Sequence, residues 1–404
     1  MSYRVKGTLI FFFSLIILIY GMILRDAPTS ASAAAIGTQT TVYLKANFFY
    51  FIYLILQIPF GFLFDRYSLK KLYFCVIFIA GIGAIIPIFS NTLIGMGYFL
   101  VVAPLSAVFV GAMVTASRWF AHRFFAIAIG FTQLFAAIGI LVGLEPLIHF
   151  VNYRGLGPAM VTAGMIGIVF AILSWFIFRE NSQEKPPPFD KVHYMDEIKI
   201  FLKSKQVWWI AIYSLFSWGT VDIFGGQWGG PFLKAKFNYS VSDMNMILAM
   251  FWFGFGLLSP LFGWISEVLD NRLTILRVGP LLGMVCSLIL LYLPLTARAN
   301  VAFLFFGVGI VGAAHMLTFA LVKDLFSLRI VGFALGFVNF FVVIGRQVFG
   351  PLTTFYFKLT GAGTTPTLLE MKQIFVLIPI FFALSFIASL FFKETHCLQT
   401  DENH

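Results

Sequence analysis

Long apolar segments recur along the whole chain, and they constrain the fold more than any other feature. Residues 7–24 form an uncharged run of 18, and similar runs follow to the end of the sequence. A bilayer core of ~30 Å needs about 20 helical residues at 1.5 Å each. The chain is 60% hydrophobic and 11% charged, against roughly 45–50% and 25% in soluble domains. The sequence therefore predicts an all-α membrane protein.

Twelve transmembrane helices are predicted, and a polar stretch separates the first six from the last six. Residues 193–205 within that stretch have the pattern of a short amphipathic helix at a membrane surface. We expect an N-terminal bundle over 1–178, a cytoplasmic linker over 179–205, a C-terminal bundle over 206–393 and a tail over 394–404. The predicted spans are 7–31, 38–60, 72–90, 94–117, 124–148, 155–178, 206–228, 241–264, 274–294, 298–322, 332–357 and 373–393.

The lysines and arginines predict the orientation. With both termini in the cytoplasm, 18 of these residues lie in cytoplasmic segments and eight on the other side, as the positive-inside rule requires. We expect a multi-pass protein of the bacterial inner membrane. The same bias explains the net charge of +10, and without a basic stripe we expect no nucleic-acid partner. Arg4 and Lys6 before an apolar run also fit a cleavable signal peptide. We expect the segment to be kept, because two matching halves of six helices require a first helix as the partner of the seventh.

The two halves resemble each other. Gly61 and Asp65 end the second span, and Gly263 and Glu267 end the eighth with the same spacing, 202 residues later. The stretch that begins at Gly130 returns 206 residues later at Gly336, again followed by a glycine nine positions on. The sequence therefore predicts two six-helix repeats, with a solute site near the membrane midplane between them.

A loop motif follows the second span. It reads Gln57-Ile-Pro-Phe-Gly61-Phe-Leu-Phe-Asp65-Arg66-Tyr-Ser68-Leu69-Lys70-Lys71. This stretch resembles the signature loop of the major facilitator superfamily, although Ser68 stands where glycine is usual and Leu69 where a base is common. The resemblance implies a bacterial secondary transporter of this family that works by alternating access, similar to its organic-anion, amino-acid or peptide carriers.

The motif also indicates a gate. Asp65 at a helix end can accept hydrogen bonds from the N-terminus of a neighbouring helix and pair with Arg66 or Arg118. Such a contact must form in one state of a transporter and break in the other. The alternative is an ordinary positive-inside loop. The predicted gating residues are Gly61, Asp65, Arg66, Lys70, Arg118, Gly263 and Glu267.

Ionisable groups inside apolar spans are costly, so each predicts a functional role. The setting of Arg25 resembles the first helix of organic-anion carriers, where an arginine receives a phosphate or carboxylate. Alternatively, Arg25 pairs with Asp26 or extends its charged end to the outer membrane interface. Arg346 either lines the cavity or pairs with Glu145. The predicted solute-binding residues are Arg25, Arg346, Lys45, Tyr20, Tyr53, Gln133, Gln227, Trp228 and Asn339.

Three further groups are candidates for proton coupling: Asp222, Glu145 and His315. Partial burial raises the pKa of a carboxyl group, and histidine titrates near neutrality. The alternative for His315 is a hydrogen-bonded packing role.

The cations near the expected site outnumber the acids, which favours an anionic or zwitterionic solute such as an amino acid, a short peptide or an organic acid. The alternatives are an organophosphate exchanger, a drug or siderophore exporter, and a non-transporting membrane sensor. We find no clustered nucleophile, base or metal ligands, and Cys75, Cys286 and Cys397 are isolated. We therefore expect no enzyme, catalytic residue, cofactor or metal site. The expected partners are the solute and the lipid bilayer, and we expect a monomer.

Overall fold

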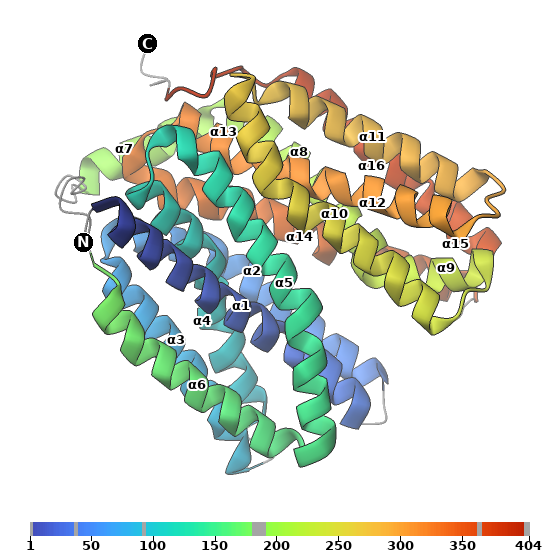
Figure 1. Ribbon diagram of the computed structural model, residues 1–404, viewed down its shortest axis with the longest axis horizontal. Helices are drawn as coiled ribbons and strands as arrows, with labels where there is room; N and C mark the ends of the chain where they lie inside the picture. The colour runs from blue at the N-terminus through green and yellow to red at the C-terminus, as the bar shows by residue number, and fades with distance from the viewer. Residues whose placement is uncertain (1–2, 36–38, 91–93, 180–190, 362–365, 400–404) are drawn as a thin grey trace. The chain divides into compact units, whose positions relative to one another are not determined.

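The computed structural model (Figure 1) describes residues 3–35, 39–90, 94–179, 191–361 and 366–399. Within these ranges the chain is helical and contains no strand. The first half has α1 (Tyr3–Ala35), α2 (Gln39–Arg66), α3 (Leu69–Ile85), η1 (Ile86–Ile88), α4 (Ile94–Trp119), α5 (His122–Arg154) and α6 (Leu156–Ile177). The linker has α7 (Lys191–Lys203). The second half has α8 (Lys205–Asp222), η3 (Ile223–Gln227), α9 (Gly229–Phe237), α10 (Val241–Val268), α11 (Leu273–Tyr292), α12 (Arg298–His315), α13 (Leu317–Leu325), η4 (Leu328–Ile330), α14 (Val331–Leu359), α15 (Leu368–Phe375) and α16 (Leu377–Leu390).

The predicted membrane spans correspond to these helices. In the described part of the chain, ten helical segments are long and apolar enough to cross a membrane. Helices α2 and α3, the latter of 17 residues, occupy the two remaining predicted spans. The linker helix expected over residues 193–205 runs from Lys191 to Lys203. The all-helical membrane architecture predicted from the apolar runs is therefore confirmed.

The chain divides into two compact units. The first comprises residues 1–128, 135–199 and 326–340, and the second 129–134, 200–325 and 341–404. In the first unit α3 packs on α4 and α6, α1 packs on α4 and α6, and α2 packs on α4. In the second unit α11 packs on α12 and α16, α8 packs on α12 and α16, and α10 packs on α12. The same set of pairs recurs with each helix replaced by its repeat partner, as a duplicated six-helix fold requires.

Three spans of the second repeat are interrupted, which the sequence did not predict. The seventh, predicted over 206–228, passes from α8 into the π-helical turn η3 near its end. The tenth breaks between α12 and α13, and the twelfth between α15 and α16. At the first break, a Cβ on Gly225 would lie 2.1 Å from the ring of Phe251. Glycine alone fits there, and a π turn widens the helix by one residue. Such turns occur often at functional sites, which draws attention to the residues beside η3.

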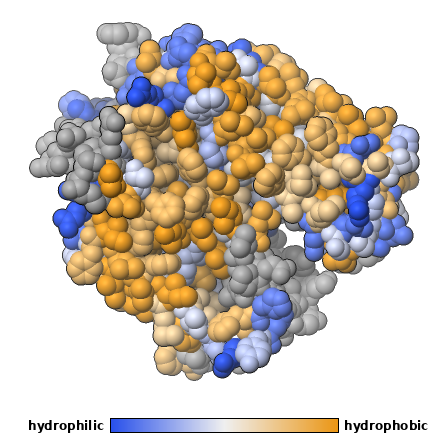
Figure 2. Space-filling view, viewed as in Figure 1, coloured by the Kyte–Doolittle hydropathy of each residue, from blue (hydrophilic) through white to orange (hydrophobic). Residues whose placement is uncertain are grey.

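Apolar side chains cover much of the visible surface (Figure 2), while hydrophilic ones gather near the helix ends. Phe89, Phe176 and Phe303 are 77%, 68% and 72% exposed. Large exposed aromatic residues in such numbers are unfavourable in water and favourable against lipid. This surface fits a chain whose helices cross a membrane.

Candidate functional site

An ion pair lies beside the helix break in the second unit. Asp222 is the last residue of α8, and Arg346 lies on α14. Gly219 and Gly345 bring the two helices into contact, because a Cβ on Gly345 would lie 2.5 Å from the Cα of Gly219. The Asp222 carboxylate is 3.5 Å from the Arg346 guanidinium, and their side chains are 12% and 38% exposed. The pair is thus only partly buried.

Polar groups continue from this pair along one face of α14. A Cβ added at Gly350 would lie 2.9 Å from Oε1 of Gln227, so the two positions adjoin. Trp228 donates from Nε1 to Oγ1 of Thr353 at 2.9 Å. Arg346, Gly350 and Thr353 are spaced by four and three residues and therefore share one side of α14. The turn after α8 thus places Asp222, Gln227 and Trp228 beside this face. Thr353 did not stand out in the sequence.

Arg25 occupies an aromatic setting in the first unit. Its guanidinium lies 5.7 Å from the ring centre of Tyr50 and 5.5 Å from that of Tyr53, within the range of cation–π attraction. Tyr20 points elsewhere, because its hydroxyl donates to the Ala163 carbonyl on α6 at 3.0 Å. Arg25 and Tyr53 are therefore brought together, and Tyr20 is placed in helix packing.

The other residues that were predicted to bind the solute or to couple the proton lie in different surroundings. Asn339 donates to Oε1 of Gln57 at 2.8 Å, and both side chains are buried. His315 is fully buried at the end of α12, with Nδ1 2.6 Å from the Gly312 carbonyl oxygen and its ring 4.9 Å from that of Trp218. Gln133 is 4% exposed on α5. The side chains of Lys45 and Glu145 lie outside the described part of the structure.

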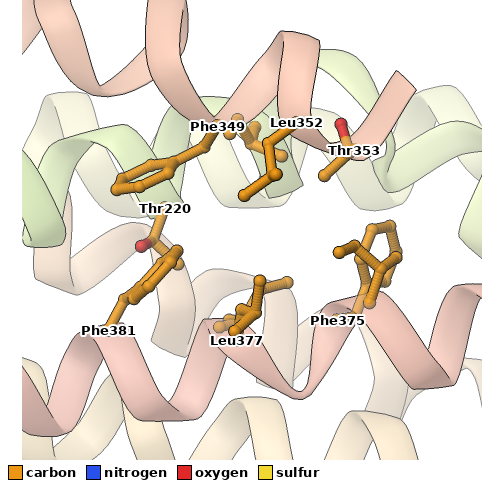
Figure 3. A pocket seen from close by; sticks show the side chains of 10 residues that line it. Thr220, Phe349, Leu352, Thr353, Phe375, Leu377 and Phe381 are labelled. Atoms are coloured by element: carbon orange, nitrogen blue, oxygen red, sulfur yellow. The ribbon is translucent and has the colours of Figure 1, made fainter. Parts of the chain in front are cut away.

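An apolar pocket lies next to the polar face of α14 (Figure 3). Phe349 and Phe381 close one side of it with rings stacked at 4.3 Å. Of its lining residues only Thr220 and Thr353 carry a polar side-chain atom. With no charged group in its wall, the pocket does not suit an ionic solute. Its full lining is Thr220, Ile223, Phe349, Leu352, Thr353, Ile374, Phe375, Leu377, Ile378 and Phe381.

Asp65 binds the first residues of α14 within the first unit. Its Oδ1 accepts from the Gly332 amide at 2.6 Å, and its Oδ2 from the Phe333 amide at 2.8 Å. A carboxylate at a helix N-terminus also gains from the helix dipole. The Tyr194 hydroxyl of α7 donates to the same Oδ2 at 2.9 Å. We call Asp65, Tyr194, Gly332 and Phe333 the Asp65 latch.

The helices at the latch touch through glycines. A Cβ on Gly61 would lie 2.3 Å from the carbonyl oxygen of Gly332, and one on Gly336 would lie 2.5 Å from that of Gln57. Only residues without a side chain allow α2 and α14 to approach this closely. The spacing of Gly61 and Asp65 in the motif therefore places the carboxylate over the start of α14.

Burial and the neighbouring groups have opposite effects on the pKa of Asp65. Asp65 lies beyond the predicted span 38–60, and the pKa of its carboxyl group is raised to about 7, because the effect of burial exceeds that of the groups that lower it. Hydrogen bonds from Phe333, Gly332 and Tyr194 and the charge of Arg118 lower the same pKa. Each donor therefore helps to keep the carboxylate ionised. Arg118 also donates to the Phe64 carbonyl oxygen.

The remaining predicted gating cations of this loop contact aromatic rings. Arg66 lies 5.4 Å from the ring centre of Tyr67. The Lys70 ammonium lies 4.1 Å from the ring centre of Trp175 on α6. Lys70 thus contacts a ring of α6 and takes part in the packing of α3 against α6.

A second charge cluster surrounds Arg272 in the second unit. Arg272 is fully buried, pairs with Glu267 at 3.1 Å, and donates through Nε to Asp324. Gly263 is buried four residues before Glu267. Residues of the tail complete the cluster, since Thr395 donates to Asp324 at 2.9 Å and Glu394 accepts from the Leu273 amide at 3.1 Å. Asp324 and these tail residues were not among the predicted gating residues.

Comparison with known proteins places the fold. A family model described as Major Facilitator Superfamily matches residues 7–229 and again 222–402. The chain is also similar to FucP, described as a transporter of that superfamily in the outward conformation, at 17% identity over 97% of this chain and 99% of that chain, with a TM-score of 0.72. A second structure, of a variant of the E. coli fucose:proton symporter FucP, matches at 17% identity over the same shares with a TM-score of 0.71. No curated protein matches the sequence significantly.

Proposed function

The chain belongs to the Major Facilitator Superfamily of membrane transporters, and we propose that it carries a small organic solute across the membrane by proton-coupled alternating access. The Asp222–Arg346 pair beside η3 is the observation that carries this proposal. At this distance the carboxylate and the guanidinium stabilise each other's charged form while the site is empty. Protonation of Asp222 releases Arg346, whose planar fork then binds a carboxylate on the solute.

The direction of coupling follows from charge balance. A solute carboxylate and an ionised Asp222 would compete for one guanidinium, so proton and anion enter the site together. After release of both, the ion pair forms again and the empty carrier returns with a compensated charge. A buried or half-buried charge without a partner is costly, which disfavours states with only one of the two ligands bound. These steps describe symport of an anionic or zwitterionic solute.

The proposed gate is the contact between α2 and α14. Helix α2 belongs to the first repeat and α14 to the second, and the glycines of both helices and the Asp65 latch join them. Breaking the contact exposes the N–H groups of Gly332 and Phe333, so opening costs several hydrogen bonds to a charged group, about 1.5–3 kcal/mol each. Substrate binding can offset a cost of that size. We place this gate, both termini and the linker on the cytoplasmic side of a bacterial inner membrane.

A neutral sugar is the second candidate solute. Two FucP structures share the fold, and one of them is described as a fucose:proton symporter. Trp228, Gln227 and Thr353 offer a ring face and neutral hydrogen-bonding groups beside the ion pair. Sugars bind through such groups, and a neutral solute leaves Arg346 paired with Asp222.

Thermal unfolding of the purified protein against panels of organic acids, amino acids, dipeptides and hexoses separates the two candidates. A bound solute stabilises the folded state by mass action. We expect a carboxylate to raise Tm more strongly at pH 6 than at pH 8, because binding takes up a proton. If a hexose alone raises Tm, with equal shifts at both pH values, the anionic proposal is wrong. Hits are then measured as labelled uptake into proteoliposomes with and without a pH gradient.

A further inference from the structure

The linker helix α7 reaches the proposed gate through one buried tyrosine. Tyr194 is 4% exposed, although most of its neighbours on α7 face outward. Its ring packs edge-on against Phe62 of α2 with ring centres 5.4 Å apart. Its hydroxyl donates to Oδ2 of Asp65, the oxygen that also accepts from the Phe333 amide. One side chain of the linker thus contacts both the helix end and the acceptor atom of the latch.

A second contact ties α7 to the segment that begins α14. Glu197 lies one helical turn after Tyr194, and its Oε1 is 3.4 Å from the guanidinium of Arg329 in η4. Gly332, whose amide binds Asp65, follows Arg329 by three residues. Residues 194 and 197 share one side of α7, and that side is therefore held to α2 and to the start of α14. Asp196 and Lys199 pair with each other and stay 57% and 65% exposed.

We propose that α7 is a working part of the gate, with Tyr194 as a positioning residue that holds Asp65 in the geometry in which it binds the α14 N-terminus. This inference rests on the proposed gating role of Asp65. The two oxygens of the Asp65 carboxylate accept hydrogen bonds from three donors. Phe333 and Tyr194 donate to the same oxygen, Oδ2, and Gly332 donates to Oδ1. Without the tyrosine hydroxyl, the carboxylate keeps one amide donor on each oxygen but loses its third donor, and its position over the start of α14 is held less firmly.

The consequence is that the linker controls the gate. Any event that shifts α7 along the membrane surface removes the Tyr194 donor and the Glu197–Arg329 pair together. Hydrogen bonds to charged groups contribute about 1.5–3 kcal/mol. The Glu197–Arg329 pair is long at 3.4 Å and its arginine is 46% exposed, so solvent weakens it. Tyr194 therefore carries most of the effect, and Glu197 mainly aligns the helix.

Hydrogen–deuterium exchange of the full-length protein in detergent tests the inference without any solute. Tyr194→Phe keeps the ring on Phe62 and removes the donor. We expect the amides at the start of α14 to exchange at least about tenfold faster than in the wild type. The matched control is Tyr67→Phe, which changes an exposed tyrosine two residues after Asp65 and leaves exchange at α14 unchanged.

A double variant shows whether Tyr194 acts through Asp65. In an Asp65→Asn background, Tyr194→Phe is expected to add no further increase at the start of α14. Unchanged exchange in Tyr194→Phe, an equal increase in both backgrounds, or an increase spread over α11 and α12 would each overturn the inference. Because no solute or gradient enters the experiment, its outcome is independent of whether the proposed transport cycle is right.

Discussion

Arg346→Gln is expected to reduce solute uptake into proteoliposomes at least about tenfold, because it removes the charged donor from the proposed site. Glutamine is polar and flexible, although shorter than arginine, so α14 is expected to keep its shape beside Gly345 and Gly350. What is lost is the planar cation that pairs with Asp222 at 3.5 Å. Arg346→Lys keeps the charge without the fork and should retain part of the uptake. Initial rates of labelled uptake, together with the solute-induced rise in Tm, measure the effect.

Arg154→Gln provides the matched control. Arg154 ends α5, is exposed, and lies over the ring of its neighbour Tyr153 at 5.3 Å. Its loss should leave uptake and Tm shifts as they are. Uptake by Arg346→Gln at the wild-type rate would show that the solute binds elsewhere, with Arg25 between Tyr50 and Tyr53 as the next site to vary.

Asp324→Asn is expected to destabilise the protein by about 3–5 kcal/mol, since it leaves a buried guanidinium with only part of its counter-charge. Arg272 is fully buried and binds Asp324 through Nε, with Nη2 3.4 Å from Oδ1. Glu267 alone would remain opposite it at 3.1 Å. Asparagine also presents an amide group toward the cation. Unfolding in mixed micelles, followed by circular dichroism, measures the loss.

An exposed ion pair of the same unit serves as the comparison. Asp243 pairs with Arg298, whose side chain is 53% exposed. Asp243→Asn should change stability little, because solvent screens such pairs. Equal effects of the two substitutions would mean that the Arg272 cluster contributes no more than a surface contact.

The apolar runs were sufficient to predict the membrane helices, because a span needs only length and the absence of charge. The interruptions at η3 and after His315 were not predictable in this way. Gly225 and Gly226 within an apolar run are also compatible with an unbroken membrane helix. Their effect depends on Phe251, which approaches from α10 and is 26 residues away in sequence. Tertiary packing decides such breaks.

The sequence alone also could not predict which of the charged residues in the membrane helices pair with each other. Arg346 was expected to line a cavity or to pair with Glu145, whose side chain lies outside the described part of the structure, and in the structure it pairs with Asp222. That choice depends on the contact between Gly219 and Gly345. The repeat marks Gly345 as the glycine nine positions after Gly336, but nothing in the sequence links it to Gly219. Asp65 is different, since the Gly61 spacing and the helix-end position already pointed to a helix N-terminus, and the donors are those of α14.

One signal for Asp324 was present in the sequence. The offset of 206 residues that relates Gly130 to Gly336 also relates Arg118 to Asp324. The repeat thus exchanges a base for an acid at equivalent helix ends, where Arg118 acts on Asp65 and Asp324 binds Arg272. Tyr194 had no such signal, because one aromatic residue in an amphipathic linker does not reveal its partner.

Asp222→Asn tests the central claim that the ion pair beside η3 couples proton and solute. Asparagine cannot exchange a proton but still fits beside Arg346. In proteoliposomes, with the solute identified by the Tm screen, the account predicts that this variant keeps exchange of labelled for unlabelled solute and loses accumulation driven by a pH gradient. Accumulation by Asp222→Asn at the wild-type level under the same gradient would contradict the account.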